Sequence, residues 1–521
     1  MRIKELFLGV ALLLSSAGGL VVEIVAGRLI APYVGMSLYT WTAIIAVVLA
    51  GLSGGHWIGG RMAGRDASDA KLARGLAIAL GLAAVSTLAI LVLVRLLSGP
   101  LLTSGMGPVW VVVILAFALF FLPSLFVGVV SPVLTKLAVD ARPDQPGPVI
   151  GRMYALGTLG AIAGTLGAGY FFISWIGSIG TLVTVAAVYA VLAVGFAASN
   201  RIGDGAWTAG LLAVAAAAIA APTEKVAAFT SPCSVESDYF CIRIDDFAEQ
   251  SGRPSTLMAL DHLVHSINDR DDPGLLFSPY IHFVDEYTRQ RLGAQALTGE
   301  FRAFFIGGGG YSLPRAWAAG FPGAKLTVAE IDPAVTIAAR DGMWLDTLHP
   351  ALDIHHRDAR ALLQSLPEAK QFDVVFGDAF HDISVPSHLV SREFHAEIAK
   401  RLKPGGFYTV NVVDHGGEPR FLASLVKTLQ LDFDAVEVWA EADELDGAIA
   451  RAGQRVTYNV VASKRDSGRQ RLLARIGIQR LWLRWPTADM LERSRGQTVV
   501  LTDDFAPVDR LMSKLLNQPE F

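Results

Sequence analysis

The chain has little of two things: cysteine and, over its first 222 residues, charge. Only 2 of its 521 residues are cysteine, which excludes a small domain held together by several disulfides. Charged residues make up 18% and hydrophobic residues 52%, with a mean hydropathy of +0.43. That balance excludes a disordered chain and a coiled coil. No basic soluble domain is present, so we expect no nucleic-acid partner.

The charges are unevenly divided along the chain. Residues 1–222 carry 12 Lys and Arg and 7 Asp and Glu, whereas residues 223–521 carry 32 and 41. Within the first part, apolar runs of about 20 residues are long enough to cross a bilayer. Seven such runs are predicted: 6–30, 39–60, 72–97, 108–130, 151–174, 177–198 and 206–222. We therefore expect residues 1–222 to form a multi-pass α-helical membrane bundle in a lipid bilayer.

Lys and Arg in the short loops predict the orientation of this bundle. Ten of them fall on the side that holds the N-terminus and three on the other, and cytoplasmic loops are the ones enriched in these residues. An odd number of spans then places the rest of the chain on the outer, periplasmic face of a cell (inner) membrane. Cys233 and Cys241 follow the last predicted span and would be free to pair there, although two buried thiols fit the sequence equally well.

Two ionisable residues interrupt the apolar runs. Glu23 and His56 lie where burial of a charge is costly, which makes such residues candidates for function. For Glu23 the alternatives are a transport or binding role and a structural hydrogen bond to a neighbouring helix. Glycines at helical spacing predict close approach between helices. They are Gly51, Gly55, Gly59, Gly157, Gly160, Gly164 and Gly167.

The pattern changes after the membrane part. Residues 231–290 predict a small β-rich segment, residues 291–465 a Rossmann-like domain, and residues 466–521 a C-terminal helical or loop extension. In the middle domain, strand-like runs such as RAFFI, KLTVAE and DVVFGD alternate with helix-like stretches. This alternation predicts a mostly parallel, doubly wound α/β sheet with an antiparallel pair at its end.

Polar residues follow four consecutive predicted strands. The first strand runs into four glycines: Gly307, Gly308, Gly309 and Gly310. A glycine turn before a helix lets the backbone approach a ligand, although a tight structural turn has the same sequence. Glu330 follows the second strand at a spacing suited to ribose hydroxyls, and Asp358 and Asp378 follow the next two. Because such strand ends share one edge of the sheet, they predict a nucleoside site.

Metal binding is not expected. Ten of the 11 histidines lie after residue 222, but His355 and His356 are adjacent and would point to opposite faces of a strand. His381, His388 and His395 form no compact ligand motif.

The segments RAFFIGGGG, TVAEIDP, RDARALL, FDVVFGDAF and LKPGGFYTVN resemble the catalytic domain of the spermidine synthases. These are polyamine aminopropyltransferases within the class I S-adenosylmethionine-dependent methyltransferase fold, and the resemblance covers about residues 231–465. The first part, with LVVEIVAGRL, GLSGGHWIGGRMAGR and GRMYALGTLGAIAG, is similar to bacterial membrane proteins that fuse a transporter-like helical region to a spermidine synthase-like domain.

The resemblance implies roles for several residues. Glu330 would bind the ribose of decarboxylated S-adenosylmethionine or S-adenosylmethionine, Asp358 would lie near the adenine, and Gly307 to Gly309 along the sulfonium tail. Asp378 matches the carboxylate that deprotonates the acceptor, an amine such as putrescine. This fits the chemistry, because an aliphatic amine with a pKa of about 10.4 is mostly protonated at neutral pH. The implied substrate-binding positions are Tyr280, Asp261, His265, His381 and Asp382.

One departure bears on the donor. Spermidine synthases read GGGDGG at the glycine turn, whereas this chain reads GGGGYS, with Gly310 in place of the aspartate that helps hold the donor amine. Three functions therefore stay open. They are a membrane-bound aminopropyltransferase, an S-adenosylmethionine-dependent methyltransferase, and a transporter or sensor that binds a nucleoside or polyamine without turnover. The sequence leaves homo-oligomerisation open.

Overall fold

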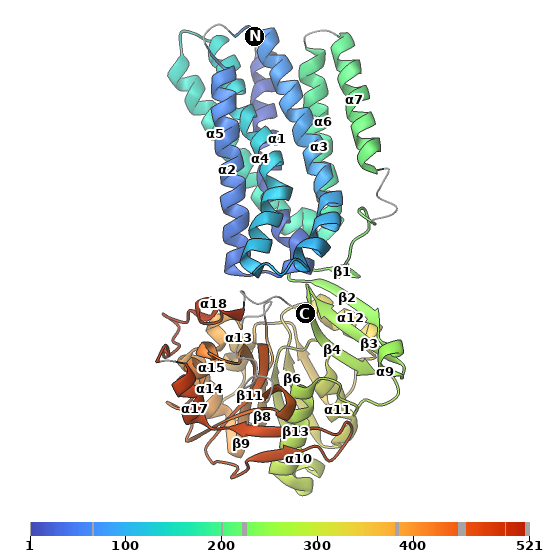
Figure 1. Cartoon of the computed structure of the whole chain (residues 1–521), viewed down its shortest axis with the longest axis vertical. Helices are drawn as coiled ribbons and strands as arrows, with labels where there is room; N and C mark the ends of the chain where they lie inside the picture. Colours follow the sequence, from blue (N-terminus) through green and yellow to red (C-terminus); the bar gives the residue numbers. More distant parts are fainter. Residues whose placement is uncertain are drawn as a thin grey trace. The chain divides into compact units, whose positions relative to one another are not determined.

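The computed structural model describes residues 2–64, 67–199, 202–220, 227–380, 385–445, 455–494 and 496–515 (Figure 1). The chain divides into two units, with the boundary between Cys241 and Ile242. The first unit is helical and the second is built around a large mixed sheet.

Long helices lie side by side in the first unit (Figure 1). They are α1 (Arg2–Val34), α2 (Leu38–Met62), α3 (Asp69–Leu102), α4 (Pro108–Asp140), α5 (Pro146–Gly167), α6 (Ile173–Ala198) and α7 (Ile202–Ala220). A π-helical turn, η1 (Ala168–Phe172), joins α5 to α6, and Gly177 breaks the helical geometry with a φ of 68°. The helices are built largely from apolar residues, as expected for a membrane bundle.

Five helical segments are long and apolar enough to cross a membrane. They are Glu5–Val34, Leu38–Met62, Asp69–Leu102, Pro108–Asp140 and Pro146–Ala198. The expected helical membrane part is thereby supported, but the count of seven spans is not confirmed. Two of the predicted spans lie within the single segment Pro146–Ala198, and α7 is not among the five.

Glycines bring two pairs of helices into backbone contact. A Cβ atom at Gly55 of α2 would lie 2.1 Å from the carbonyl oxygen of Leu125 in α4. One at Gly160 of α5 would lie 2.2 Å from the carbonyl oxygen of Leu13 in α1. No side chain fits at either position, so these members of the predicted glycine series do allow close helix packing.

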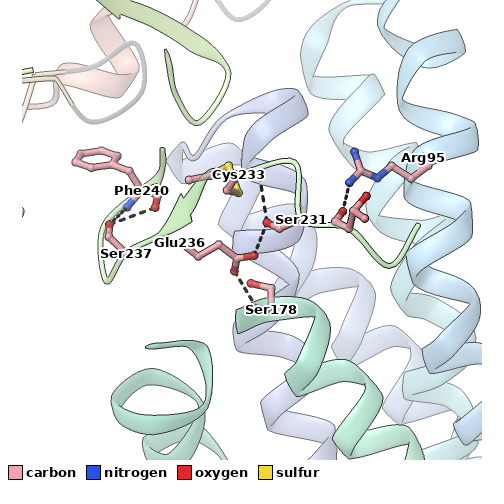
Figure 2. Close-up of a disulfide and its surroundings, with 9 residues drawn as sticks. Arg95, Ser178, Ser231, Cys233, Glu236, Ser237 and Phe240 are labelled. Carbon is pink, nitrogen blue, oxygen red and sulfur yellow. Dashed lines mark hydrogen bonds between the residues drawn. A yellow bond between two sulfur atoms is a disulfide. The ribbon is translucent and has the colours of Figure 1, made fainter. Parts of the chain in front are cut away.

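A disulfide joins Cys233 to Cys241 after the last helix of this unit (Figure 2). Between the two cysteines lies β1 (Val235–Glu236). The Glu236 carboxylate accepts hydrogen bonds from the backbone N–H of Ser178, at 2.9 Å, and from the Ser231 hydroxyl, at 2.8 Å. Glu236 therefore caps the part of α6 that follows the break at Gly177.

The second unit begins with three antiparallel strands. These are β2 (Cys241–Asp246), β3 (Ser255–Leu260) and β4 (Leu263–Asp269), and β3 pairs with both of the others. The large sheet follows, in the order β12-β13-β10-β11-β9-β8-β5-β6-β7. Its strands are β5 (Phe301–Ile306), β6 (Ala324–Ala329), β7 (Leu352–His355), β8 (Phe372–Gly377), β9 (Leu402–His415), β10 (Ala435–Glu441), β11 (Arg455–Ser463), β12 (Arg471–Leu473) and β13 (Leu481–Trp485).

Most helices of the second unit connect successive strands of the large sheet along the chain. They are α9 (Ala248–Ser251), α10 (Pro279–Thr298), α11 (Ser312–Gly320), α12 (Pro333–Gly342), α13 (Ala359–Ser365), the 3-10 turn η2 (Ser387–Leu389), α14 (Arg392–Arg401), α15 (Arg420–Leu429), α17 (Thr487–Arg493) and α18 (Val508–Leu511). Strands β7, β6, β5, β8 and β9 are parallel, and β11 and β10 add an antiparallel pair. The predicted α/β alternation is confirmed.

One expectation about the C-terminal extension was incomplete. Residues 466–521 were expected to be helical or loop, but they contain β12 and β13, which extend the sheet beyond β10. In β13 the side chains of Trp482 and Trp485 are buried, and Leu483 and Arg484 lie between them in the sequence. A short strand of this composition gains its stability from the neighbouring β10, which sequence propensity alone does not reveal.

Candidate functional site

The glycine turn follows β5 and lies against the end of β8. Gly307 has a φ of 97°, and a Cβ atom there would come within 2.6 Å of the carbonyl oxygen of Asp378. The backbone N–H of Asp378 also donates to the carbonyl of Ile306, at 2.9 Å. Because a side chain has no room at Gly307, the glycine lets these two strand ends approach each other.

Glu330, after β6, is bound to the same turn. One of its carboxylate oxygens accepts from the N–H groups of Gly308 and Gly309, at 2.8 and 3.3 Å. The other accepts from the N–H of Asp332, at 2.9 Å. The residue is 5% exposed, and this burial raises its pKa even though the three N–H donors favour the charged form. Glu330 thus fixes the shape of the glycine turn.

Asp358, after β7, begins α13. One carboxylate oxygen accepts from the N–H of Ala361 at 2.9 Å, and the other lies 2.8 Å from Nε2 of His388. Burial works to raise the pKa of Asp358, but the Ala361 and His388 contacts outweigh it and leave that pKa below its usual value. The carboxylate is therefore ionised and partly open to solvent.

Asp378 follows the end of β8, and both of its carboxylate oxygens accept hydrogen bonds. The side-chain amide of Asn411, in β9, donates to one at 2.9 Å, and the Tyr280 hydroxyl, at the start of α10, donates to the other at 3.2 Å. Burial raises the pKa of Asp378 to about 6, and the two hydrogen bonds oppose that rise. A carboxyl group with such a pKa changes protonation close to neutral pH, as a general base or acid requires.

A pocket of about 260 Å³ lies on the Tyr280 side of Asp378. It is lined by Pro279, Tyr280, Glu441, Glu444, Thr457, Asn459 and Trp482. Two of these side chains are acidic, and burial raises the pKa of Glu441 and brings that of Glu444 to about 7. Glu444 accepts from the N–H of Thr457 at 3.0 Å, and Glu441 lies 3.4 Å from Nε of Arg480.

A second pocket, of about 250 Å³, lies on the Asn411 side. Its lining is mainly apolar and includes Ile306, Ala379 and Leu389 together with Asn411. The side-chain oxygen of Asn411 is buried without a hydrogen-bond partner among the described residues. The two side chains that bind Asp378 therefore line one pocket each.

Gly310 lies where no side chain fits. A Cβ atom there would lie 2.5 Å from Cβ of Ser266 and 2.9 Å from Cε of Met343. The Ser266 hydroxyl accepts from the N–H of Gly310 at 2.9 Å, and the Asn268 side chain donates to the Gly310 carbonyl at 2.8 Å. Ser266 of β4 thus occupies the space that an acidic side chain at position 310 would need.

The remaining predicted substrate positions are only partly brought together. The backbone carbonyl of His265 accepts from the Tyr280 hydroxyl at 3.4 Å, and the His265 pKa is lowered to about 4, chiefly by burial, so the ring is neutral near pH 7. Asp261 is buried in the turn between β3 and β4 with a φ of 54°. His381 and Asp382 lie outside the described residues, and Glu23 belongs to the helical unit.

Sequence reasoning missed Asn411, Glu441 and Glu444. Asn411 is a single amide within the buried run FYTVNVV, and that interruption was the available signal. The two glutamates lie at and just after the end of β10, next to β11. Their convergence on Tyr280 depends on the antiparallel pairing, which carries no local sequence signal.

No family model matches the chain. A polyamine aminopropyltransferase of Vibrio vulnificus (strain CMCP6) is 32% identical over 111 residues, which are 21% of this chain and 37% of that protein. A probable polyamine aminopropyl transferase of Bifidobacterium longum (strain NCC 2705) is 27% identical over 247 residues, 44% of this chain and 54% of that protein. Spermidine synthase-like relatives thus cover the C-terminal part of this chain. The matches span less than two thirds of either relative's length.

A solved structure, that of a probable spermidine synthase from Corynebacterium glutamicum ATCC 13032, aligns with a TM-score of 0.44 and 19% identity. The alignment covers 54% of this chain and 99% of that one. A spermidine synthase from Thermotoga maritima aligns with a TM-score of 0.29 and 18% identity, over 40% of this chain and 66% of that one.

Proposed function

We propose that the second unit transfers an aminopropyl group from decarboxylated S-adenosylmethionine to a small amine such as putrescine. The observation that carries this proposal is the position of Asp378, whose carboxylate is bound by Tyr280 from an acidic pocket and by Asn411 from an apolar one. The similarity of the C-terminal part to two polyamine aminopropyltransferases supports it.

The donor would lie along the strand ends that begin with the glycine turn. Glu330 would accept a hydrogen bond from a ribose hydroxyl through the oxygen that binds only the N–H of Asp332, since its other oxygen already accepts from two N–H groups. Asp358 would lie near the adenine, and Gly307 to Gly309 would follow the sulfonium tail. The apolar pocket lined by Leu389 and Asn411 supports this placement of the nucleoside.

Asp378 would then act on the acceptor. An ammonium ion has no free lone pair, so the carboxylate accepts its proton and leaves a neutral amine. The nitrogen lone pair forms a bond to the carbon next to sulfur while the C–S bond breaks. The bonding electrons go to sulfur and release neutral methylthioadenosine. A pKa of about 6 keeps most Asp378 ionised at neutral pH, and holding the two substrates in line supplies the rest of the rate.

The acidic pocket supports a cationic acceptor. Glu441 and Glu444 would bind the far ammonium group of a diamine whose near nitrogen faces Asp378. Tyr280 lines this pocket and also binds Asp378, so it connects the two ends of such a substrate. Asp261, His265, His381 and Asp382 stay proposals as further acceptor-side residues.

A second function is favoured by one observation. Ser266 fills the space beside Gly310, so the turn carries no carboxylate to pair with the aminopropyl ammonium of the decarboxylated donor. Intact S-adenosylmethionine would then be admitted, and its methyl group would be the one transferred to the amine.

We further propose that the helical unit crosses the membrane seven times. Arg142 binds Glu5 at 2.6 Å just before the segment Pro146–Ala198, and the rings of Phe7 and Phe196 lie 5.0 Å apart near its end. Both ends of that segment therefore lie beside the first turns of α1, which supports two crossings, α5 and α6, rather than one. With α7 the number becomes seven.

Seven crossings and a cytoplasmic N-terminus would place the catalytic unit on the periplasmic face of an inner membrane. The disulfide between Cys233 and Cys241 supports an oxidising compartment for this end of the helical unit. A reporter fused after Phe521 tests the side. A periplasmic signal supports the proposal, and a cytoplasmic signal excludes it.

The enzymatic proposal is tested by offering the purified full-length protein decarboxylated and intact S-adenosylmethionine in separate reactions, each with putrescine. A product heavier by one aminopropyl unit, with methylthioadenosine as the second product, is the expected result. A methylated amine made only from the intact donor would instead select the second function. If neither donor is consumed, both functions are excluded.

A further inference from the structure

Two buried polar side chains line the proposed acceptor pocket and leave hydrogen-bonding groups unused. Trp482 in β13 is 1% exposed and Asn459 in β11 is 2% exposed, and both line the pocket of about 260 Å³. The indole Nε1 of Trp482 and the side-chain oxygen of Asn459 have no hydrogen-bond partner among the described residues. Because a buried polar atom without a partner is costly, these two atoms indicate that a group bound in the pocket supplies their hydrogen bonds.

The register of the sheet brings both side chains to one face. Asn459 is opposite Trp439 of β10, and Trp482 is opposite Glu441, two residues further along the same strand. Residues opposite each other share a face of the sheet, and so do residues two positions apart in a strand. Asn459, Trp482 and Glu441 therefore project to the same side. There the Trp482 ring packs edge-on against His282 of α10, at a centroid distance of 5.3 Å.

One of the two carboxylates in this pocket already has a cationic partner. Nε of Arg480 lies 3.4 Å from the Glu441 carboxylate, and its terminal nitrogens donate to the carbonyls of Leu276 and Phe277, at 3.1 and 2.5 Å. Since an arginine stays charged at any physiological pH, the charge of Glu441 is compensated. Glu444 is left for one ammonium group of a bound amine, so any further polar group of the ligand need not be charged.

The two unpartnered atoms need opposite partners. An indole N–H only donates a hydrogen bond, whereas the oxygen of an amide side chain only accepts one. An ammonium group has donors alone, so it pairs with Asn459 but not with Trp482. A hydroxyl group both donates and accepts, and it is the smallest group that serves both atoms.

We propose that the amine bound in this pocket carries a hydroxyl group on its carbon chain. The hydroxyl oxygen accepts from Nε1 of Trp482, and its proton is donated to the side-chain oxygen of Asn459, while Glu444 binds the far ammonium group. This inference rests on the proposed function, since it takes the pocket as the acceptor site. It narrows the acceptor from diamines in general to hydroxylated diamines.

The experiment measures the binding of putrescine and of 1,4-diamino-2-butanol to the purified full-length protein by calorimetry, in the absence of donor. These two diamines differ by one hydroxyl group. We expect the hydroxylated diamine to bind about tenfold more tightly, which is the gain that one or two neutral hydrogen bonds provide. Equal affinities, or tighter binding of putrescine, would overturn the proposal.

Two variants connect this preference to the two side chains. Trp482→Phe removes the N–H and Asn459→Leu removes the amide oxygen, so each should reduce the preference to about threefold or less. The ratio of two affinities measured in one preparation does not depend on the fraction of folded protein. A preference that is unchanged in both variants would overturn the proposal.

Trp439→Phe is the matched control. Trp439 lies on the same face of the sheet, but its Nε1 donates to Glu437 at 3.0 Å and it is not among the residues that line the pocket. This variant should keep the preference of the unmodified protein. An equal loss of preference in Trp439→Phe and Trp482→Phe would assign the effect to packing of the sheet and contradict the assignment to Trp482.

Turnover separates this inference from the catalytic proposal. If no donor is consumed but the hydroxylated diamine binds more tightly, and this depends on Trp482 and Asn459, the catalytic proposal fails and the inference about the pocket stands. If methylthioadenosine forms with both diamines and their KM values are equal, the catalytic proposal stands and this inference fails.

Discussion

The side-chain amide of Asn411 donates a 2.9 Å hydrogen bond to the carboxylate of Asp378, from the strand next to the one that Asp378 follows. Its own oxygen is buried in the apolar pocket without a partner among the described residues. A donor in this position stabilises the ionised form of Asp378. It partly offsets the burial that raises the pKa of that residue to about 6.

Replacing Asn411 by Leu should therefore change the pH profile of the reaction. Without the donor, the pKa of Asp378 should rise further, by about one to two units, because a hydrogen bond to a charged group contributes about 1.5–3 kcal/mol. In the unmodified protein the rate should fall as the pH drops through about 6, where the carboxylate becomes protonated. In the variant this fall should occur at higher pH, and alkaline buffer should restore part of the lost rate.

Thr409→Val is the matched control for this shift. Thr409 is buried two residues earlier in β9, and its hydroxyl has no partner among the described residues. Removing this hydroxyl should leave the pH profile of the reaction unchanged. An identical profile for Asn411→Leu and the unmodified protein would show that Asn411 does not act on Asp378.

Glu444→Gln should weaken the binding of the acceptor amine and leave the binding of the donor unchanged. The carboxylate lies in the pocket beside Tyr280 and would bind the far ammonium group of a diamine. We expect KM for putrescine to rise about tenfold, with KM for the donor unchanged. Because burial brings the pKa of Glu444 to about 7, KM for putrescine should also fall in the unmodified protein as the pH rises from 6 to 8.

Glu300→Gln serves as the control for acidic residues in general. Glu300 pairs with Arg302 and Lys325 at the surface, away from the pocket residues. An equal rise in KM for both glutamate variants would assign the effect to overall charge rather than to the pocket.

The sequence was informative about the proposed donor side, because the residues there follow parallel strands, which place them at one edge of the sheet. Glu330 accepts there from the N–H groups of Gly308 and Gly309 at 2.8 and 3.3 Å. The N–H of Asp378 donates to the carbonyl of Ile306, next to Gly307, at 2.9 Å. The acceptor side was less predictable. Glu441 and Glu444 reach Tyr280 through antiparallel pairing between distant segments, and no local periodicity encodes that contact.

The membrane part was predictable from local apolar length. Apolar length predicted helices correctly, because only helices satisfy the backbone within a short segment. The apolar runs 151–174 and 177–198 also predicted a division of this segment, and Gly177, with a φ of 68°, breaks the helical geometry at the start of the second run.

Gly310→Ala should destabilise the second unit. The new methyl group would overlap Ser266, and overpacking of this kind costs about 1–3 kcal/mol. Ser266→Gly should relieve the overlap, so the double variant should be more stable than Gly310→Ala alone. Urea unfolding of the four proteins gives the coupling between the two positions.

The control for that series is Gly274→Ala, which lies in an exposed turn where the nearest atom belongs to the Asp272 side chain. This substitution should leave the free energy of unfolding almost unchanged. If Ser266→Gly does not restore the stability lost in Gly310→Ala, Ser266 does not limit the space at Gly310. Ser266 would then not explain why position 310 carries no acidic side chain.

The disulfide should contribute measurably to the stability of the end of the first unit. Closing a loop with a sequence separation of 8 residues stabilises by about 2–3 kcal/mol in the chain-entropy model. The double variant Cys233→Ser, Cys241→Ser should therefore unfold at a lower temperature, and hydrogen exchange at Ser178 should become faster because Glu236 is less firmly held. If hydrogen exchange at Ser178 is unchanged, the disulfide does not hold Glu236 in its capping position.

The central claim is that Asp378 removes the proton from an amine held against a sulfonium donor. Its most direct test is the rate of methylthioadenosine formation by Asp378→Asn with decarboxylated S-adenosylmethionine and putrescine, measured beside donor affinity. We predict a loss of at least about a hundredfold in kcat, the contribution typical of a general base, with donor affinity unchanged. A variant that keeps the full rate would contradict the account.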